Sequence, residues 1–178
     1  MSRNSRGPLA VVRLALSAAP ACGAVQAPAA QAAQTTARGQ VCMFTYPYSR
    51  DALAGHVAWA FQTGPNRWTF GSYSKRPMWK SGWTTSAMIS KFRRMGYDGY
   101  RCKWTHQRRA SAATATWQRL RRTPYRLWTN NCLTVSVAVF RSYSRELRSL
   151  PSASGTLPRR YYDRTLPRYG FGKNHRLR

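Results

Sequence analysis

Acidic residues are almost absent from this sequence. Its 178 residues include only four, and these are far apart along the chain: Asp51, Asp98, Glu146 and Asp163. Glycoside hydrolysis needs two carboxyl groups that flank one bond. The sequence therefore argues against that chemistry, and the shortage of acids leaves a formal net charge of +26.

Three other signals are missing. The cysteines and histidines show neither a C-x-x-C nor an H-x-x-x-H spacing, which argues against a zinc site. No glycine-rich motif that could cradle a phosphate is present. No stretch after the N-terminal region has the roughly 20 apolar residues that a membrane span needs. We therefore expect no cofactor, no bound metal and no membrane-spanning helix.

Positive charge is what the chain has in excess, from 30 lysine and arginine residues spread over its whole length. Such a charge attracts polyanions such as nucleic acid, wall polymers or anionic lipid headgroups. A GC-rich genome also enriches arginine, so composition alone leaves the meaning of the charge open. The apolar fraction of 43% predicts a folded domain and not a disordered basic tail.

The first 32 residues have the organisation of an export signal. Arg3, Arg6 and Arg13 supply a positive start, residues 14–25 are apolar and rich in alanine, and Ala30-Gln31-Ala32 offers a cleavage site. We predict a secreted protein; a disordered Ala-rich leader is the alternative. Loss of this segment would remove Cys22 and leave Cys42, Cys102 and Cys132. An odd number of cysteines in an oxidising compartment indicates one disulfide and one free thiol, and we favour a Cys42–Cys102 bridge.

Hydrophobic patterning predicts a mixed fold of strands and helices. A strong turn signal at Gly64-Pro65-Asn66 joins two strand-like runs and favours a β-hairpin. The segment after Asn131 has alternating valines, but its length and its cap signal favour a buried helix. We expect strands at 55–61, 68–73, 97–105 and 125–128, helices at 86–95, 110–122 and 132–148, loops at 74–83 and after residue 151, docked Tyr161 and Tyr162, and free last residues.

Cys132 and His56 are the candidate catalytic residues. Cys132 begins the predicted helix, where the helix dipole and free N–H groups favour a thiolate and can stabilise an oxyanion. His56 begins an apolar strand, whereas His106 and His175 lie in segments that we expect to be solvated. The alternatives are a small core cysteine and a half-buried structural histidine. Asn131 is expected to cap the helix.

Three short segments include these residues: Gly55-His56-Val57-Ala58-Trp59-Ala60-Phe61, Trp68-Thr69-Phe70-Gly71-Ser72 and Tyr125-Arg126-Leu127-Trp128-Thr129-Asn130-Asn131-Cys132. They resemble the circularly permuted papain-like hydrolases, which are similar to the NlpC-type peptidases and the lecithin:retinol acyltransferase-like proteins. In that group a histidine on an early strand precedes a nucleophilic cysteine that heads a helix. The segment Gly96-Tyr97-Asp98-Gly99-Tyr100 resembles its counterpart in small secreted actinobacterial members of uncertain function, and the whole resemblance covers about residues 42–165.

The resemblance implies an α+β fold, a small antiparallel sheet packed against a few helices, with the nucleophile at the N-terminus of the central helix. It implies that Cys132 forms a thioester, that His56 acts as general base and acid, and that a polar group on the next strand orients His56. That strand offers Thr69 and Ser72 in place of the histidine or acid most often found there. We take Ser72 as the orienting group.

The sequence thus predicts a secreted, monomeric thiol hydrolase or acyltransferase that acts on an amide or ester in a peptide or cell-wall fragment. The alternative is a non-catalytic cationic protein that binds an anionic envelope polymer or nucleic acid. The expected organisation is a signal peptide at 1–32, a polar leader at 33–41, a papain-like domain at 42–165 and a basic tail at 166–178.

Overall fold

The computed structural model describes residues 37–48 and 54–177. They form a six-stranded antiparallel sheet in the order β4-β3-β2-β1-β5-β6, in which neighbouring strands are hydrogen-bonded. The α+β class with a small antiparallel sheet is confirmed. The strands are β1 (Gly39–Tyr46), β2 (His56–Gly64), β3 (Arg67–Ser72), β4 (Met78–Trp83), β5 (Gly99–Thr105) and β6 (His175–Arg176).

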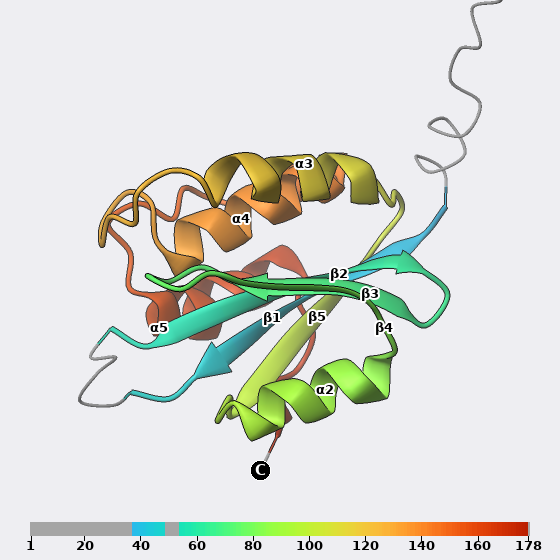
Figure 1. The fold of residues 1–178 in the computed structure, drawn as a ribbon, viewed down its shortest axis with the longest axis horizontal. Coiled ribbons are helices and arrows are strands. Elements are labelled where there is room, and N and C mark those ends of the chain that lie inside the picture. The colour runs from blue at the N-terminus through green and yellow to red at the C-terminus, as the bar shows by residue number, and fades with distance from the viewer. Residues whose placement is uncertain (1–36, 49–53, 178) are drawn as a thin grey trace, which may run out of the picture.

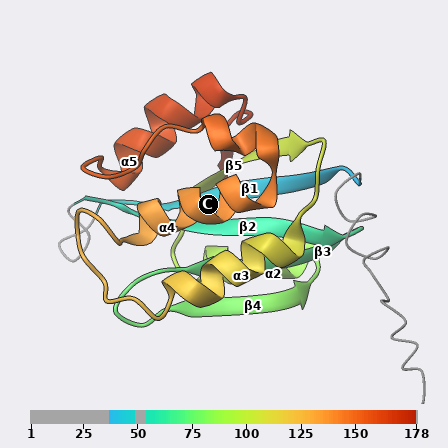
Figure 2. The same cartoon turned by 90° about the horizontal axis from the view of Figure 1, so that it is seen from above.

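Helices cover both faces of this sheet. Figure 1 shows α3 and α4 on one face and α2 on the other, and Figure 2 shows α5 beside α4. The segment that begins with α5 continues without a break through a π-helical and a 3-10 turn. The helical elements are α2 (Thr85–Arg94), α3 (Ala110–Leu120), α4 (Cys132–Tyr143), η1 (Arg145–Ser149), α5 (Pro158–Arg160), η2 (Tyr161–Thr165) and η3 (Leu166–Tyr169).

Strand alternation divides the apolar side chains into two cores, because successive residues of a strand point to opposite faces. Val57 and Trp59 of β2 pack in the core under α3 and α4, together with Cys132. Ala58 and Ala60 pack in the core under α2. The two-residue period of β2 therefore specifies two helical layers, and α4 lies over the centre of the sheet.

The predicted helix after Asn131 is confirmed, although it is shorter than expected. Seven of its first nine residues are buried, as is typical of a helix that packs on both a sheet and another helix. The backbone becomes extended at Ser144 (φ −144°, ψ 145°), and a 3-10 turn follows. The valine alternation that suggested a strand reflects burial on several sides of α4.

The predicted disulfide is also confirmed. Cys42 of β1 and Cys102 of β5 are directly opposite in the strand register, and their Cα atoms are 4.1 Å apart. Residues directly opposite each other on neighbouring antiparallel strands are close enough for a disulfide bridge. Among the described cysteines, Cys132 is the free one.

Four predictions about local structure are wrong. The expected loop at 74–83 contains β4, an edge strand with little burial. The expected strand at 125–128 is a turn closed by a bridge between Arg126 and Asn130. The expected loop after residue 151 contains the helical segment 158–169, and the last residues are not free, because His175–Arg176 pairs with β5. Tyr161 and Tyr162 are buried, as predicted.

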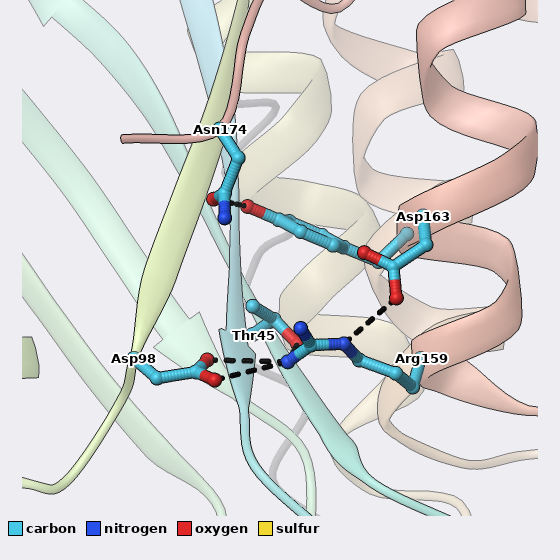
Figure 3. A network of polar contacts seen from close by, with 6 residues as sticks. Thr45, Asp98, Arg159, Asp163 and Asn174 are labelled. Atoms are coloured by element: carbon cyan, nitrogen blue, oxygen red, sulfur yellow. Dashed lines mark hydrogen bonds and ion pairs between the residues drawn. The ribbon is translucent and has the colours of Figure 1, made fainter. Parts of the chain in front are cut away.

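A polar network fixes the helical segment 158–169 to the sheet (Figure 3). Arg159 Nη1 lies 3.0 Å from Asp98 Oδ2, and its Nε lies 2.8 Å from Asp163 Oδ2. The hydroxyl of Tyr162 donates to Asn174 Oδ1 at 2.6 Å. Two of the four acids of the chain thus hold one arginine, and the guanidinium connects the helix to the residue before β5.

The predicted signal peptide at 1–32 lies outside the described residues. β1 begins at Gly39, within the segment that we named a polar leader, and the helical segment crosses the boundary that we placed after residue 165. No helix in the described ranges is long and apolar enough to cross a membrane.

Candidate functional site

Cys132 is the first residue of α4, and its side chain is 2% exposed. Asn131 precedes it in extended conformation and caps the helix, as predicted. Its Oδ1 accepts from the N–H groups of Leu133 and Thr134, each at 2.9 Å, while the Thr134 hydroxyl accepts from the N–H of Asn131. This reciprocal pair is a capping box, which fixes where the helix starts and therefore where the thiol lies.

The cap leaves one N–H group free at the start of α4. The N–H groups of Asn131, Leu133 and Thr134 are occupied by the capping box, and that of Val135 donates to the Asn131 carbonyl. Within the described ranges, no oxygen atom accepts from the N–H of Cys132, which lies near its own sulfur. Of the N–H groups at the helix start that we expected to stabilise an oxyanion, one donor next to the sulfur therefore remains.

Burial controls the ionisation of the thiol. It raises the pKa of Cys132 from its ordinary value of 9.0 to about 11, and this outweighs the backbone N–H groups of Val57, Leu133 and Cys132, which favour the thiolate. Burial therefore reverses our expectation that the helix start would favour the thiolate. At neutral pH the resting group is a thiol.

His56 and Ser72 are brought together by the pairing of β2 with β3. His56 Nε2 and Ser72 Oγ are hydrogen-bonded at 2.7 Å. Thr69, the other candidate from that strand, is bonded instead to Ser81 of β4, with 2.7 Å between the two hydroxyl oxygens. Of the two hydroxyls that the sequence offered, the structure places only Ser72 where it can orient the imidazole.

Burial also controls the charge of His56, since it lowers the pKa of the imidazole from 6.5 to about 4. The ring is neutral at physiological pH. Its Nδ1 has no hydrogen-bond partner among the residues that the structure describes. A neutral ring that donates from Nε2 to Ser72 keeps a lone pair on Nδ1, the arrangement that a general base needs.

The thiol and the imidazole share a stretch of β2 backbone, and no hydrogen bond joins the Cys132 sulfur to the His56 ring in the described part of the chain. The N–H of Val57 lies close enough to the Cys132 sulfur to favour its ionised form, and Val57 follows His56 directly in β2. The start of α4 therefore meets β2 beside the histidine. His106 and His175 are exposed and lie elsewhere, as expected.

Tyr97 is a site neighbour that the sequence did not single out as a candidate. The centroid of its ring lies 6.2 Å from that of His56, and a hydrogen bond from Ser72 opposes the rise in the Tyr97 pKa that burial causes. Ser72 thus lies between His56 and Tyr97. The sequence carried no signal for this contact, which depends on how the segment after α2 returns to the sheet.

A small cavity of about 50 Å³ opens at Cys132. Three of its lining residues are large apolar side chains that are unusually exposed: Leu127 (55%), Trp128 (58%) and Leu157 (40%). Exposed apolar groups around a concave site are typical of ligand recognition. The cavity is lined by Ala54, Gly55, Tyr125, Leu127, Trp128, Asn131, Cys132, Thr156, Leu157 and Pro158.

The chain matches no family model, no curated protein and no solved structure. No group of three or more potential metal ligands is found within the described ranges.

Proposed function

We propose that the protein is a thiol hydrolase or acyltransferase in which Cys132 is the nucleophile, His56 the general base and acid, and Ser72 the positioning residue. The observation that carries the proposal is the meeting of α4 with β2. The free thiol lies beside Val57, which follows His56 directly in β2, and the Nε2 atom of His56 is hydrogen-bonded to Ser72. This arrangement supports the permuted papain-like organisation implied by the resemblance.

The first half of the reaction follows from the protonation states. With a thiol pKa of about 11 and an imidazole pKa of about 4, the resting pair is uncharged. The proton therefore moves from sulfur to His56 Nδ1 as the sulfur attacks the carbonyl carbon. The developing oxyanion accepts from the free N–H of Cys132. The imidazolium then protonates the leaving amine or alcohol, and a thioester remains on Cys132.

In the second half, His56 takes a proton from a water molecule that attacks the thioester carbonyl. The tetrahedral intermediate collapses, the carboxylic acid leaves, and the imidazolium returns its proton to the sulfur. An amine or alcohol in place of water would complete an acyl transfer. A buried, weakly acidic thiol suits this scheme, because a thiolate of high pKa is the stronger nucleophile once formed.

The compartment and the substrate are part of the same proposal. The Cys42–Cys102 disulfide fits an oxidising compartment and therefore supports export of the protein. We place the protein outside the cell as a monomer, acting on a peptide or a cell-wall fragment. The exposed apolar residues around Cys132 favour a substrate with an apolar group next to the bond that is cleaved.

Acylation of Cys132 tests the proposal directly. In a Cys22→Ser background, the folded chain is mixed with 4-nitrophenyl acetate, and adducts are located by intact-mass and peptide mass spectrometry. We expect an acetyl group on Cys132 that forms at least about tenfold more slowly in His56→Gln. Ser72→Ala should slow it less, and the exposed His106→Gln serves as the matched control. Equal rates in His56→Gln and His106→Gln would contradict the role of His56.

The positive charge favours a second candidate function, binding of an anionic polymer without catalysis. Among the described residues, Arg159 is the only arginine or lysine in an ion pair, so most of the charge is available to a partner. Binding of this kind weakens steeply as salt is added. It would persist unchanged in Cys132→Ala, and the wild-type chain would form no acyl adduct.

A further inference from the structure

A second cavity, of about 460 Å³, adjoins the one at Cys132. Thr156 and Leu157 line both, so a molecule could extend from one to the other without leaving the protein surface. We call the larger one the arginine groove. It is lined by Gly155, Thr156, Leu157, Arg160, Arg164, Thr165 and Arg168.

The arginine groove has a net charge that no acid within it offsets. Arg160, Arg164 and Arg168 are exposed, and none of them forms an ion pair or hydrogen bond with another residue in the described part of the chain. Asp163 lies beside Arg160 and Arg164 on an adjoining surface, but its Oδ2 accepts from Arg159 Nε at 2.8 Å. In the network of Figure 3 both carboxylates bind Arg159, so the network has a net charge of −1, and the three groove arginines take no part in its ion pairs.

The spacing of these arginines suits a chain of anionic groups and not a single ion. They follow one another at intervals of four residues, about one turn, along the helical segment 158–169, and successive helical turns are roughly 5–6 Å apart. In an extended peptide, alternate side chains lie on the same side and are roughly 6.6 Å apart. A guanidinium group binds a carboxylate in a two-pronged hydrogen-bonded pair.

We propose that the arginine groove is a subsite for an acidic stretch of a peptide substrate, with carboxylates at alternate positions. An apolar residue next to the stretch would then lie against Leu127 and Trp128, at the cavity that contains Cys132. This inference rests on the proposed function of Cys132, because it assigns the groove to the substrate of that thiol. The hydroxyls of Thr156 and Thr165 supply further hydrogen bonds to the peptide.

Binding can be measured without catalysis. In the full chain with Cys22→Ser and Cys132→Ala, the affinity for a fluorescent peptide is measured by anisotropy; the peptide has one apolar residue followed by glutamates at alternate positions. The groove variant is Arg160→Gln, Arg164→Gln and Arg168→Gln together. The matched control is Arg93→Gln, Arg94→Gln and Arg119→Gln, which removes the same charge from exposed positions on α2 and α3.

The groove variant should weaken binding about tenfold and the control less than about twofold, since each exposed pair contributes modestly. A peptide with glutamine in place of glutamate should bind as weakly as the groove variant does. Equal losses in the two triple variants would overturn the proposal, because they would indicate only a long-range effect of charge. Inorganic polyphosphate or an oligonucleotide that binds more tightly than the peptide would overturn it as well.

Failure of the inference and failure of the proposed function give different results. If Cys132 is acylated with dependence on His56 but the groove variant binds and cleaves the acidic peptide normally, the subsite is wrong and the nucleophile stands. If the groove binds the acidic peptide specifically but no acyl adduct forms, the proposed catalysis is wrong. Thermal unfolding of both triple variants checks that these exposed substitutions leave the fold intact.

Discussion

The ionisation of Cys132 can be tested by alkylation of the folded protein. Burial raises the pKa of the thiol from 9.0 to about 11, a change of about two pKa units or about 2.7 kcal/mol against the thiolate. At about pH 8, roughly one thiol in a thousand is ionised at the higher value, compared with roughly one in ten at the lower value. Only the thiolate reacts with iodoacetamide at a useful rate.

We therefore expect folded protein to be alkylated at least about 100-fold more slowly than urea-unfolded protein at about pH 8. The side chain is only 2% exposed, and this adds to the difference. The rate for the folded chain should rise about tenfold per pH unit toward pH 11, whereas that for the unfolded chain should level off above pH 9. The measurement needs the Cys22→Ser chain with its disulfide intact, so that one thiol is read by mass spectrometry.

Trp128→Ala tests whether burial is the cause of the raised Cys132 pKa. The indole is 58% exposed and lines the cavity at Cys132, so its removal admits water to the sulfur at little cost in stability. Alkylation of this variant should be faster, and its pH profile should shift toward lower pH. A folded wild-type protein whose rate levels off near pH 8.5 would refute the burial argument and restore the activated thiolate that the sequence suggested.

Three further predictions concern stability, measured by urea unfolding. The imidazole of His56 has a pKa of about 4 in the folded state and 6.5 in the unfolded state, so the unfolded state binds more protons between these two pH values. The free energy of unfolding should therefore fall by about 3 kcal/mol as the pH falls from 6.5 to about 4. His56→Gln should remove most of this pH dependence. The disulfide closes a sequence separation of 60 residues, so Cys42→Ala with Cys102→Ala should cost about 4 kcal/mol, and a loss below about 1 kcal/mol would contradict this. Asp98→Asn should lower the free energy of unfolding by about 1–2 kcal/mol, and Asp163→Asn by about 0.5 kcal/mol or less. The reason for this ranking is that the Asp98 side chain is 19% exposed and that of Asp163 is 43% exposed. Equal losses in the two variants would refute it.

Much of the fold could be predicted where a short local signal determines the backbone geometry. The turn at Gly64-Pro65-Asn66 predicted the hairpin of β2 and β3, and Asn66 adopts the positive φ of 48° that such a turn favours. The capping residue Asn131 predicted the start of α4. In both cases one short pattern determines a backbone geometry that does not depend on distant residues.

Two elements were missed because their sequences carry the opposite local signal. β4 contains Lys80-Ser81-Gly82, three exposed residues that break the apolar alternation expected of a strand. An edge strand needs little burial, since it pairs on one side only. In the segment 158–169, Pro158 and Pro167 suggested a loop, but each lies in the first turn of a helical element, where proline is favoured.

The pKa of Cys132 was predicted in the wrong direction for a different reason. A helix start lowers a thiol pKa by a local effect that the sequence shows. Burial raises it by an effect that depends on segments far apart in the chain: residues 54–55 before β2, the turn at 125–128 and residues 156–158 all surround the cavity. No pattern within the α4 sequence reveals that these segments meet over the sulfur.

The scarcity of acids determines where the positive charge can act. Three of the four acids lie in the described ranges, and each makes internal contacts: Asp98 and Asp163 bind Arg159, and Glu146 accepts from the N–H of His106. No described acid forms an ion pair with the arginines next to the Cys132 cavity. A compositional excess of arginine would by itself scatter charge over the surface. In the helical segment 158–169, however, Arg160, Arg164 and Arg168 all line one groove next to the cavity at Cys132. This placement is a property of the fold. If only the total charge of the chain mattered, the groove variant and the control variant would lose the same binding affinity.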